Sequence, residues 1–365
     1  MLPFDQHAGR PAKAGQVAPL YMVIREKQFR QLFPTAPAFR WKQIEKALFD
    51  PLVLGWQGVT VLSKSMRDTL EKNIPWVSWK DSRVFESARK DTFKAMLMLA
   101  DDKKIETVLM KNPRDQWTIC VSSQVGCAMK CGFCATGKMG LFRSLTHDEI
   151  TDQYRFWQQF LRDHPTLAQR ISNVVFMGMG EPLANYDNVK KTLQTWLTTT
   201  DLGYTRITVS SVGIIPLLEK VLKDPEWPHV RLAISLHSAD PITRKALMPT
   251  SHDQFIDQFQ DWAKRYLKKL GNRRHHLTFE YVMLRAVNDT DHHANALGKL
   301  VKTLGKTKVN LIPYNFTDLE FKRSLDSQID QFKKILEHWG AEVTVRRTMG
   351  DDIAAACGQL ITKNR

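Results

Sequence analysis

Three cysteines, Cys127, Cys131 and Cys134, form the feature of this chain with the clearest chemical meaning. Their C-x₃-C-x₂-C spacing contains no histidine, whereas tetrahedral zinc sites usually show paired ligands in a complete set of four. Iron–sulfur clusters are held by cysteine thiolates, usually four. Three thiolates in so short a loop therefore predict a cubane [4Fe–4S] cluster with one open iron, which can bind a small molecule through an amine and a carboxylate. Structural zinc and plain buried thiols are the alternative interpretations.

A glycine-rich turn, Gly178-Met179-Gly180-Glu181-Pro182, follows an apolar, strand-like run. Its glycines permit close approach of the backbone to a ligand, and Glu181 supplies a carboxylate for an ammonium group. Taken alone, the segment is typical of a strand-to-helix turn, and it does not match the G-x-G-x-x-G pattern of dinucleotide binding. The cysteine spacing, however, resembles the radical S-adenosylmethionine (SAM) signature, where the methionine end of SAM fills the open iron. With that resemblance we expect Gly180 and Glu181 to bind SAM.

The elements that must position these residues begin near Trp117, where strand-like and helical runs start to alternate. The expected strands are 118–122, 173–177, 206–210, 230–236, 277–284, 308–314 and 342–347. Amphipathic runs between them, at 146–160, 186–197, 215–222, 254–270, 292–304 and 327–339, are the expected helices. Repeated alternation of this kind predicts an α/β fold with a parallel sheet and crossover helices, either doubly wound or curled into a barrel.

Polar side chains gather where these strands end. The cysteine loop follows the first strand and the glycine-rich turn the second, while Ser210 ends the third. Ser235, Leu236 and His237 end the fourth strand, and Asn315 ends the sixth. Because active sites of (β/α) barrels form at the carboxyl ends of the strands, we expect these residues at one edge of the sheet. A lone histidine is more often a satisfied polar group than a ligand, but this position favours a binding role.

Two cysteines lie outside the cluster loop. Cys357 follows the last strand among Gly, Asp and small residues, and is either a small buried hydrophobe or an accessible nucleophile. Cys120 lies near the end of the first strand and is either a core thiol or the partner of Cys357. Glu106 precedes an apolar run, and its default interpretation is a surface carboxylate.

Composition and periodicity divide the chain into four parts. Residues 1–18 are rich in Pro, Gly and Ala, lack periodicity and are expected to be flexible. Residues 19–83 carry apolar side chains at helical spacing, such as Phe39, Ile44 and Leu48, and predict a small helical domain. Residues 84–116 contain candidate strands at 84–87, 93–99 and 107–110 and predict a connector packed on the core. The barrel, with its C-terminal cysteine loop, is expected over residues 117–365.

The net charge favours a nucleic-acid partner. The 53 Lys and Arg residues exceed the 38 Asp and Glu residues, giving +15. The usual partners of such a surface are nucleic acids or anionic membranes. No apolar run approaches the roughly 20 residues of a membrane helix, and the N-terminal residues lack the apolar core of a signal peptide. Only five cysteines in 365 residues argue against a disulfide scaffold and fit a reducing cytoplasm.

One basic run has two interpretations. It consists of Lys264, Arg265, Lys268, Lys269, Arg273 and Arg274. Such a run is most often the solvated face of a helix, and the alternative is contact with phosphates.

Taken together, these residues resemble the radical-SAM RNA adenine methyltransferases typified by RlmN and Cfr. The resemblance runs from about residue 21 to residue 360. Its most specific parts are VSSQVG leading into CAMKCGFCATG, then GMGEPLAN, ISLHS, EYVML with VND, NLIPYN, and GDDIAAACGQL. The segment FRWKQI at 39–44 looks like the accessory RNA-binding domain of the family. The resemblance implies a partial (β/α)6 radical-SAM barrel with a small N-terminal helical domain.

The resemblance also implies a role for each site residue. Cys127, Cys131 and Cys134 would hold the cluster, while Gly180, Glu181, Ser210, Ser235, Leu236, His237 and Asn315 would hold SAM. Cys357 would be methylated and carry the new carbon. Cys120 would release the product by forming a transient disulfide with Cys357. Glu106 matches a carboxylate assigned as proton acceptor, and either Glu106 or Cys120 takes the substrate proton.

The chemistry explains why such residues are needed. Carbon 2 and carbon 8 of adenine are electrophilic and have no lone pair, so ordinary methyl transfer fails. One SAM would methylate Cys357, and a second would be cleaved reductively to a radical that takes hydrogen from the S-methyl group. The resulting carbon radical would add to the ring. Hard radical chemistry of this kind belongs to the cofactor, and the protein supplies geometry and exclusion.

Two departures from the family pattern bear on the target carbon. Residues 316–321 replace a Pro- and Gly-rich stretch, and the chain stops soon after Cys357, which favours Cfr-like relatives. The segments QVGC at 124–127 and EP at 181–182 favour RlmN. We expect methylation of 23S rRNA adenosine at carbon 2, with tRNA as a further substrate and flavodoxin or ferredoxin as electron donor. The alternatives are a Cfr-type carbon-8 enzyme of antibiotic resistance and a non-enzymatic zinc-dependent RNA-binding protein.

Overall fold

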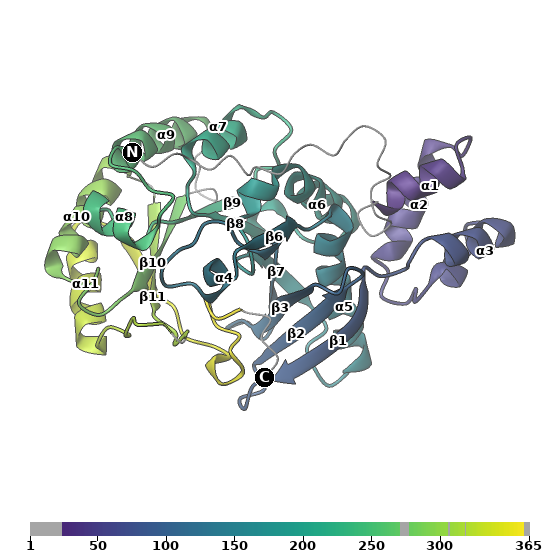
Figure 1. The fold of residues 1–365 in the computed structure, drawn as a ribbon, viewed down its shortest axis with the longest axis horizontal. Coiled ribbons are helices and arrows are strands. Elements are labelled where there is room, and N and C mark those ends of the chain that lie inside the picture. The colour runs from purple at the N-terminus through teal and green to yellow at the C-terminus, as the bar shows by residue number, and fades with distance from the viewer. Residues whose placement is uncertain (1–23, 271–276, 306, 318, 361–365) are drawn as a thin grey trace.

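A sheet curved into a partial barrel forms the centre of the molecule (Figure 1). The computed structural model describes residues 24–270, 277–305, 307–317 and 319–360. In this part of the chain the strand order is β1-β2-β3-β4-β7-β8-β9-β10-β11-β12. The parallel strands are β4 (Trp117–Cys120), β7 (Ile171–Phe176), β8 (Ile207–Ser211), β9 (Arg231–Ser235), β10 (Leu277–Met283), β11 (Thr307–Pro313) and β12 (Glu342–Val345).

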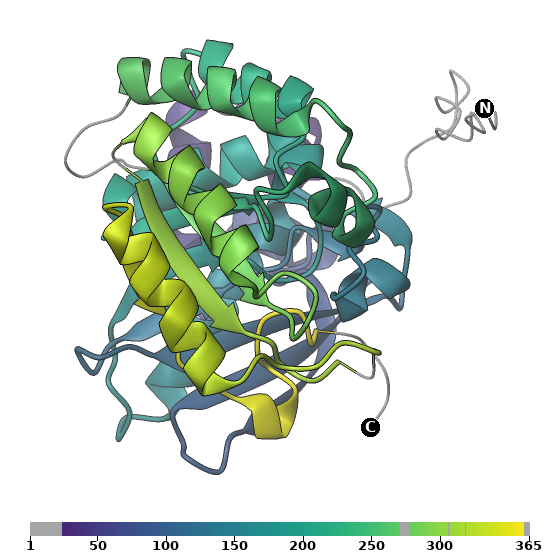
Figure 2. The same cartoon turned by 90° about the vertical axis from the view of Figure 1, so that its left-hand side faces the viewer.

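Helices cover the outer face of the parallel strands. They are α5 (His147–Asp163), α6 (Tyr186–Thr199), α7 (Ile215–Lys223), α8 (Pro241–Leu247), α9 (Phe255–Leu270), α10 (Asp291–Leu304) and α11 (Asp326–His338). Figure 2 shows α9, α10 and α11 side by side across this face. Each of the seven expected strands and six expected helices overlaps an element of the structure. The α/β fold class and the partial (β/α)6 barrel are therefore confirmed, with β12 as a further strand at the edge.

Three antiparallel strands, β1 (Trp79–Glu86), β2 (Thr92–Leu99) and β3 (Lys104–Lys111), extend the sheet beyond β4. The edge strand β1 begins at Trp79, before the expected range 84–87. The sequence did not predict this earlier start because the side chains of β1 are mostly exposed and show no alternation of apolar and polar residues. A separate ribbon of β5 (Gln124–Gly126) and β6 (Leu141–Ser144) encloses the cysteine loop and the short helix α4 (Ala135–Lys138).

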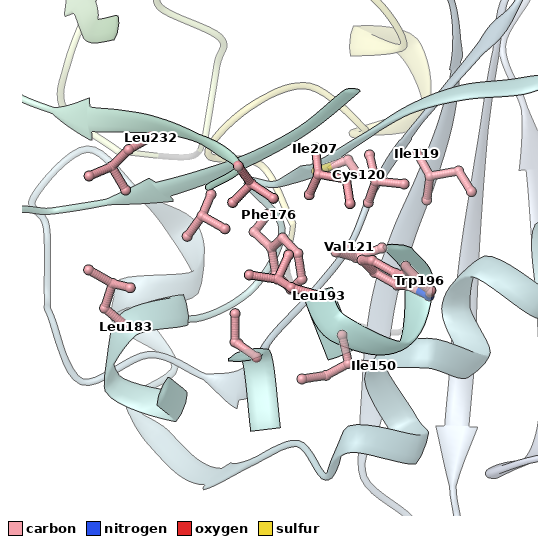
Figure 3. Close-up of a cluster of buried hydrophobic side chains, with 14 of the residues drawn as sticks. Ile119, Cys120, Val121, Ile150, Phe176, Leu183, Leu193, Trp196, Ile207 and Leu232 are labelled. Carbon is pink, nitrogen blue, oxygen red and sulfur yellow. The ribbon is translucent and has the colours of Figure 1, made fainter. Parts of the chain in front are cut away.

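The main core lies between the sheet and the helices α5 and α6. Figure 3 shows Leu193 and Trp196 of α6 and Ile150 of α5 gathered against Val121 and Phe176 from the strand side. Of these side chains, Ile150, Leu193 and Trp196 are completely buried. A capping box, in which Thr146 and Glu149 bond each other's backbone amides, fixes the start of α5. The core thus anchors β4 and β7, the two strands that precede the cysteine loop and the glycine-rich turn.

Three N-terminal helices, α1 (Arg25–Leu32), α2 (Ala38–Leu48) and α3 (Lys64–Asn73), lie beside α5 and α6 (Figure 1). Buried charges join them to α5. Asp152 accepts hydrogen bonds from the Arg25 and Arg155 guanidinium groups and from the Ser78 amide, the last at 2.7 Å. Arg155 Nε donates to the Leu48 carbonyl oxygen at 2.6 Å. Burial alone would raise the pKa of Asp152, but Arg155 and Arg25 lower it below its ordinary value.

The Asp152→Ala variant is expected to be strongly destabilised. It leaves the buried Arg155 guanidinium without a carboxylate and the buried Arg25 guanidinium with Asp148 alone, and breaking a buried ion pair from one side costs about 3–5 kcal/mol. Thermal unfolding compared with Asp163→Ala, an exposed change on the same helix, measures the effect. Equal melting temperatures for the two variants would contradict this assignment.

The division into domains stays a prediction, and the expected flexible segment 1–18 lies outside the described residues. Within the described residues, the structure contains no helix with the length and apolar character that a membrane crossing requires.

Candidate active site

One cavity at the carboxyl ends of the parallel strands collects most of the predicted site residues. Its lining includes Cys127, Cys131, Cys134, Gly180, Glu181, Ser210, Ser235, His237 and Cys357. These residues come from segments up to 230 positions apart in the chain, between Cys127 and Cys357. The parallel topology brings them together because every strand ends at the same edge.

The three cluster-loop cysteines lie between β5 and α4. The Cys127 amide donates to the Gly140 carbonyl oxygen at 2.9 Å, and the Cys134 amide donates to the Cys131 carbonyl oxygen at 3.1 Å. Burial, together with the charges of Cys134 and Glu181, raises the pKa of the Cys127 thiol to about 11. Burial and the same neighbours also raise the pKa of Cys131. The three sulfurs therefore lie within electrostatic reach of one another.

This arrangement fits a cluster. In the described part of the chain no three His, Cys, Asp or Glu side chains gather at one point that suits a single metal ion. A cubane cluster binds each thiolate to a different iron, so three thiols spread around one cavity are what it needs. Glu280, which lines the same cavity, has a buried Oε2 with no hydrogen-bond partner among the described residues. That oxygen remains available to accept a hydrogen bond from a bound molecule.

The glycine-rich turn holds its carboxylate rigidly. Glu181 Oε1 accepts from the Leu183 amide at 3.0 Å, and Oε2 accepts from the Val212 amide at 2.9 Å. Burial nevertheless raises the pKa of Glu181 to about 7. Gly180 has a φ of 98°, and a Cβ there would lie 2.5 Å from Cβ of Gln124. Only glycine fits this position, and its backbone lines the cavity beside the carboxylate.

The ends of β8 and β9 contribute a polar wall. Ser210 Oγ lies 3.4 Å from Ser235 Oγ. His237 Nδ1 accepts from the Val282 amide at 3.1 Å, which places the ring proton on Nε2. Burial lowers the pKa of His237 to about 3, so the ring is neutral. Leu236 differs from its neighbours, because its side chain packs in the core and does not line the cavity.

The segment that carries Cys357 is bonded to the cluster loop. The Ala135 amide donates to the Gly358 carbonyl oxygen at 2.9 Å, and Thr136 Oγ1 donates to the Leu360 carbonyl oxygen at 2.7 Å. Asn315 Nδ2 donates to the Cys357 carbonyl oxygen at 3.2 Å. Asn315 therefore supports the segment that carries Cys357. It is not among the residues that line the cavity, so its contact with SAM stays a prediction.

Arg346 is a charged group close to the two thiols outside the cluster loop, and sequence reasoning missed it. Its Nη2 donates to Glu280 Oε1 at 3.1 Å, and its positive charge acts on both thiols. Desolvation of the sulfur by its surroundings raises the pKa of Cys357, although the residue as a whole is exposed, and Arg346 opposes that rise. Burial and the charge of Cys357 raise the pKa of Cys120 to about 12. One signal in the sequence could have revealed the Arg346–Glu280 pair. Glu280 is the single charged residue of β10, and a charge in a buried strand indicates a partner of opposite charge.

Glu106 is buried rather than at the surface, so its default interpretation is wrong. The strand register pairs Lys94 with Val108 and Val108 with Cys120, so Lys94, Glu106 and Cys120 project from one face of the sheet. Lys94 Nζ lies 3.0 Å from Glu106 Oε1 and donates to the Ala354 carbonyl oxygen at 3.2 Å. Lys94 thus connects the carboxylate with the segment that carries Cys357.

Two further expectations from the sequence concern the pairing of Cys120 with Cys357 and the basic run. All five cysteines are free thiols, so the structure holds no Cys120–Cys357 disulfide. The basic run lies toward the end of α9, and crossover helices run opposite to their strands, which places it away from the cavity. Arg265 also pairs with Glu219 and Asp261, while Arg273 and Arg274 lie outside the described residues. Contact of this run with phosphates stays a prediction.

Comparisons with known proteins agree with this site. The Radical SAM superfamily model matches residues 121–296. The dual-specificity RNA methyltransferase RlmN of Desulfotalea psychrophila is 41% identical over 333 residues, covering 89% of this chain and 90% of that protein. The probable dual-specificity RNA methyltransferase RlmN of Aquifex aeolicus is 37% identical over 329 residues, covering 89% of this chain and 91% of that protein.

A solved structure agrees as well. The radical SAM methyltransferase from Sphaerobacter thermophilus superimposes with a TM-score of 0.84 at 35% identity, covering 93% of this chain and 98% of that one. These relatives are enzymes, so the alternative of a non-enzymatic zinc protein is wrong. The chain belongs to the RlmN family of radical SAM methyltransferases.

Proposed function

We propose that this enzyme methylates carbon 2 of an adenosine in 23S rRNA and acts on a tRNA adenosine as well. The observation that carries the proposal is that Cys357 lines the same cavity as the three cluster-loop cysteines, Gly180 and Glu181. The relatives named dual-specificity RNA methyltransferases support an RNA substrate. A cytoplasmic location follows from that substrate and from free thiols that need a reducing environment.

The cofactors would occupy the cavity. Cys127, Cys131 and Cys134 would hold the [4Fe–4S] cluster, and Gly180 and Glu181 would hold the methionine end of SAM. When bound and supplied with an electron by flavodoxin or ferredoxin, these groups provide the radical that abstracts hydrogen from a methyl group. Ser210, Ser235 and the Nε2–H of His237 offer hydrogen bonds to the rest of the SAM molecule.

Cys357 would receive a methyl group from a first SAM, before a second SAM is used. Methyl transfer needs the thiolate, whereas burial favours the thiol. Arg346 favours the thiolate through its positive charge, and Glu280 keeps the guanidinium in place. The open side of Cys357 allows an adenine base to approach the methyl carbon.

Cys120 would then release the product. Its thiolate attacks the Cys357 sulfur, so an S–S bond forms and the carbon–sulfur bond breaks, with the electron pair moving to the methylene carbon. That carbon takes a proton and becomes the methyl group. Before that step, Glu106, held by Lys94 on the same sheet face, or Cys120 itself removes the ring proton, and the unpaired electron of the adduct would be taken up by the oxidised cluster. The disulfide must be reduced before the next turnover.

SAM affinity is expected to depend on pH through Glu181. The pKa of this carboxyl is raised to about 7, so it is ionised above that pH and binds the ammonium group of SAM there. We expect the Kd for SAM to weaken about tenfold from about pH 8 to about pH 6, as the ionised fraction falls. Equilibrium dialysis with the cluster-loaded protein measures this, and Glu181→Gln should remove the pH dependence. An unmodified protein with a constant Kd over this range would contradict the assignment.

Nucleoside analysis tests the proposed function directly. The purified, anaerobically reconstituted enzyme is incubated with SAM, a reductant and an RNA fragment containing adenosines. Digestion and chromatography against standards should show 2-methyladenosine, and Cys357→Ala should give none. 8-Methyladenosine as the product would support the Cfr-type alternative instead, and a nitrogen-methylated base would overturn the radical mechanism.

A further inference from the structure

A second cavity, of about 450 Å³, lies next to the active site at the edge of the barrel. Arg89, Arg323, Arg346, Arg347 and Thr348 are among the residues that line it. It is separated from the active site only by the end of β11. Successive side chains of a strand point to opposite faces, and here Pro313 lines the second cavity while its neighbours Ile312 and Tyr314 line the first.

The charge in this cavity is positive and partly unneutralised. Arg346 pairs with Glu280, and Arg323 pairs with Asp326 at 2.8 Å. Arg89 and Arg347 have no ion pair with the described residues, and both residues are exposed to solvent. Asp330 is the remaining carboxylate in the lining. Two guanidinium groups are therefore available to an anionic ligand.

Hydrogen bonds connect the cavity with the segment that carries Cys357. Thr348 Oγ1, on the cavity wall, donates to Asn315 Oδ1 at 3.1 Å, and Asn315 Nδ2 donates to the Cys357 carbonyl oxygen. The amide of Ala88, the neighbour of Arg89, also donates to Asp352 Oδ2 at 2.7 Å. Residues in or next to the cavity lining are therefore hydrogen-bonded to the C-terminal segment that carries Cys357.

We propose that this arginine cavity binds a backbone phosphate of the RNA strand whose adenosine enters the active site. The inference rests on the proposed function and adds the place where the strand is held. Arginine forks match phosphate oxygens, and phosphate contacts position a nucleic acid without reading its sequence. The volume lies within the range of ligand pockets, and the lining has no aromatic side chain on which a base could stack. A phosphodiester is therefore the part of RNA that this cavity suits.

The Arg89→Gln/Arg347→Gln double variant tests the proposal by its salt dependence. RNA binding is measured as a function of salt with the cluster-loaded protein and a single-stranded rRNA fragment. Loss of two phosphate contacts should flatten the log–log slope by about 1.4, since each contact contributes about 0.7 on single strands. The matched control is Arg170→Gln/Arg206→Gln, which removes two exposed arginines that directly precede β7 and β8, at the amino ends of these strands. Its slope should stay that of the unmodified protein.

Two further measurements distinguish a failure of the phosphate-site proposal from a failure of the proposed function. 2-Methyladenosine should still form in the Arg89→Gln/Arg347→Gln variant at saturating RNA and low salt, so the proposed function is tested apart from this cavity. Inorganic phosphate should compete with RNA in the unmodified protein and less so in the variant. Equal slopes in the two double variants would overturn the proposal. A phosphate effect at Arg89 and Arg347 without any change in the RNA slope would also overturn it, since the cavity would then bind only the free ion.

Discussion

Replacing Cys120 with alanine is expected to leave RNA covalently attached to the protein through Cys357. The two thiols lie within electrostatic reach of each other and share Arg346, whereas the cluster-loop cysteines line the cavity beside them. Methylation of Cys357 and addition of its carbon to the base do not need Cys120. Release does, because a second thiol must break the carbon–sulfur bond.

A denaturing gel of the anaerobic reaction shows the outcome. The Cys120→Ala variant should give a slow-migrating protein–RNA species, with at most about one turnover of product, while the Cys120→Ala/Cys357→Ala variant should give none. Cys120→Ser is the conservative control and should trap RNA in the same way, since a hydroxyl cannot form the disulfide. Normal turnover by Cys120→Ala without a trapped species would show that this thiol is only a core residue.

Replacing Cys131 with alanine is expected to abolish both iron binding and SAM cleavage. The three thiols of the loop line the same cavity as Gly180 and Glu181, and a loop with two of them lacks the ligands that a cubane cluster needs. Cluster ligands act as a unit, so we expect Cys127→Ala and Cys134→Ala to have the same effect. Iron and sulfide analysis of anaerobically purified protein measures the loss.

The matched control for this prediction is Cys357→Ala. It removes a thiol from the same cavity but outside the cluster loop, so iron content and reductive SAM cleavage should remain near those of the unmodified protein. Full iron occupancy in Cys131→Ala would contradict the cluster assignment. Loss of iron in Cys357→Ala would show instead that the C-terminal thiol is a cluster ligand.

Much of the fold was predictable because each β/α unit encodes its own periodicity. In β10, for example, the apolar side chains of Leu277, Phe279, Tyr281 and Met283 occupy alternate positions, and the helices between strands carry an apolar stripe. The cysteine loop was predictable for a similar reason, since its three ligands lie within eight residues, from Cys127 to Cys134. Local pattern was sufficient in both cases.

The groups that sequence reasoning missed depend on contacts between distant segments. Arg346 acts on Cys120 and Cys357 only because β12 lies beside β11 and the following segment returns over the cavity. Lys94 meets Glu106 through the register of β2 and β3, and Ala354 through the fold of the C-terminal segment. The spacing of residues in the sequence does not predict such long-range contacts. An isolated charged residue in a mostly apolar strand indicates only that a buried partner charge exists.

The positions of the positive charges in the folded protein could also not be predicted from the sequence. The basic residues clustered in α9 lie on a helix whose end the barrel topology directs away from the active site. Arg89 and Arg347 are far apart in the sequence but line one cavity beside it. The local density of charge in the sequence therefore does not indicate where that charge lies relative to the active site.

Transfer of a labelled methyl group from Cys357 tests the central claim most directly. Protein methylated on Cys357 with carbon-13 is freed of SAM and then given unlabelled SAM, a reductant and RNA for a single turnover. The account predicts that the first 2-methyladenosine carries the carbon-13 label and that the Cys357 peptide loses it in equal amount. Unlabelled 2-methyladenosine, formed while the Cys357 peptide keeps its carbon-13, would contradict the account.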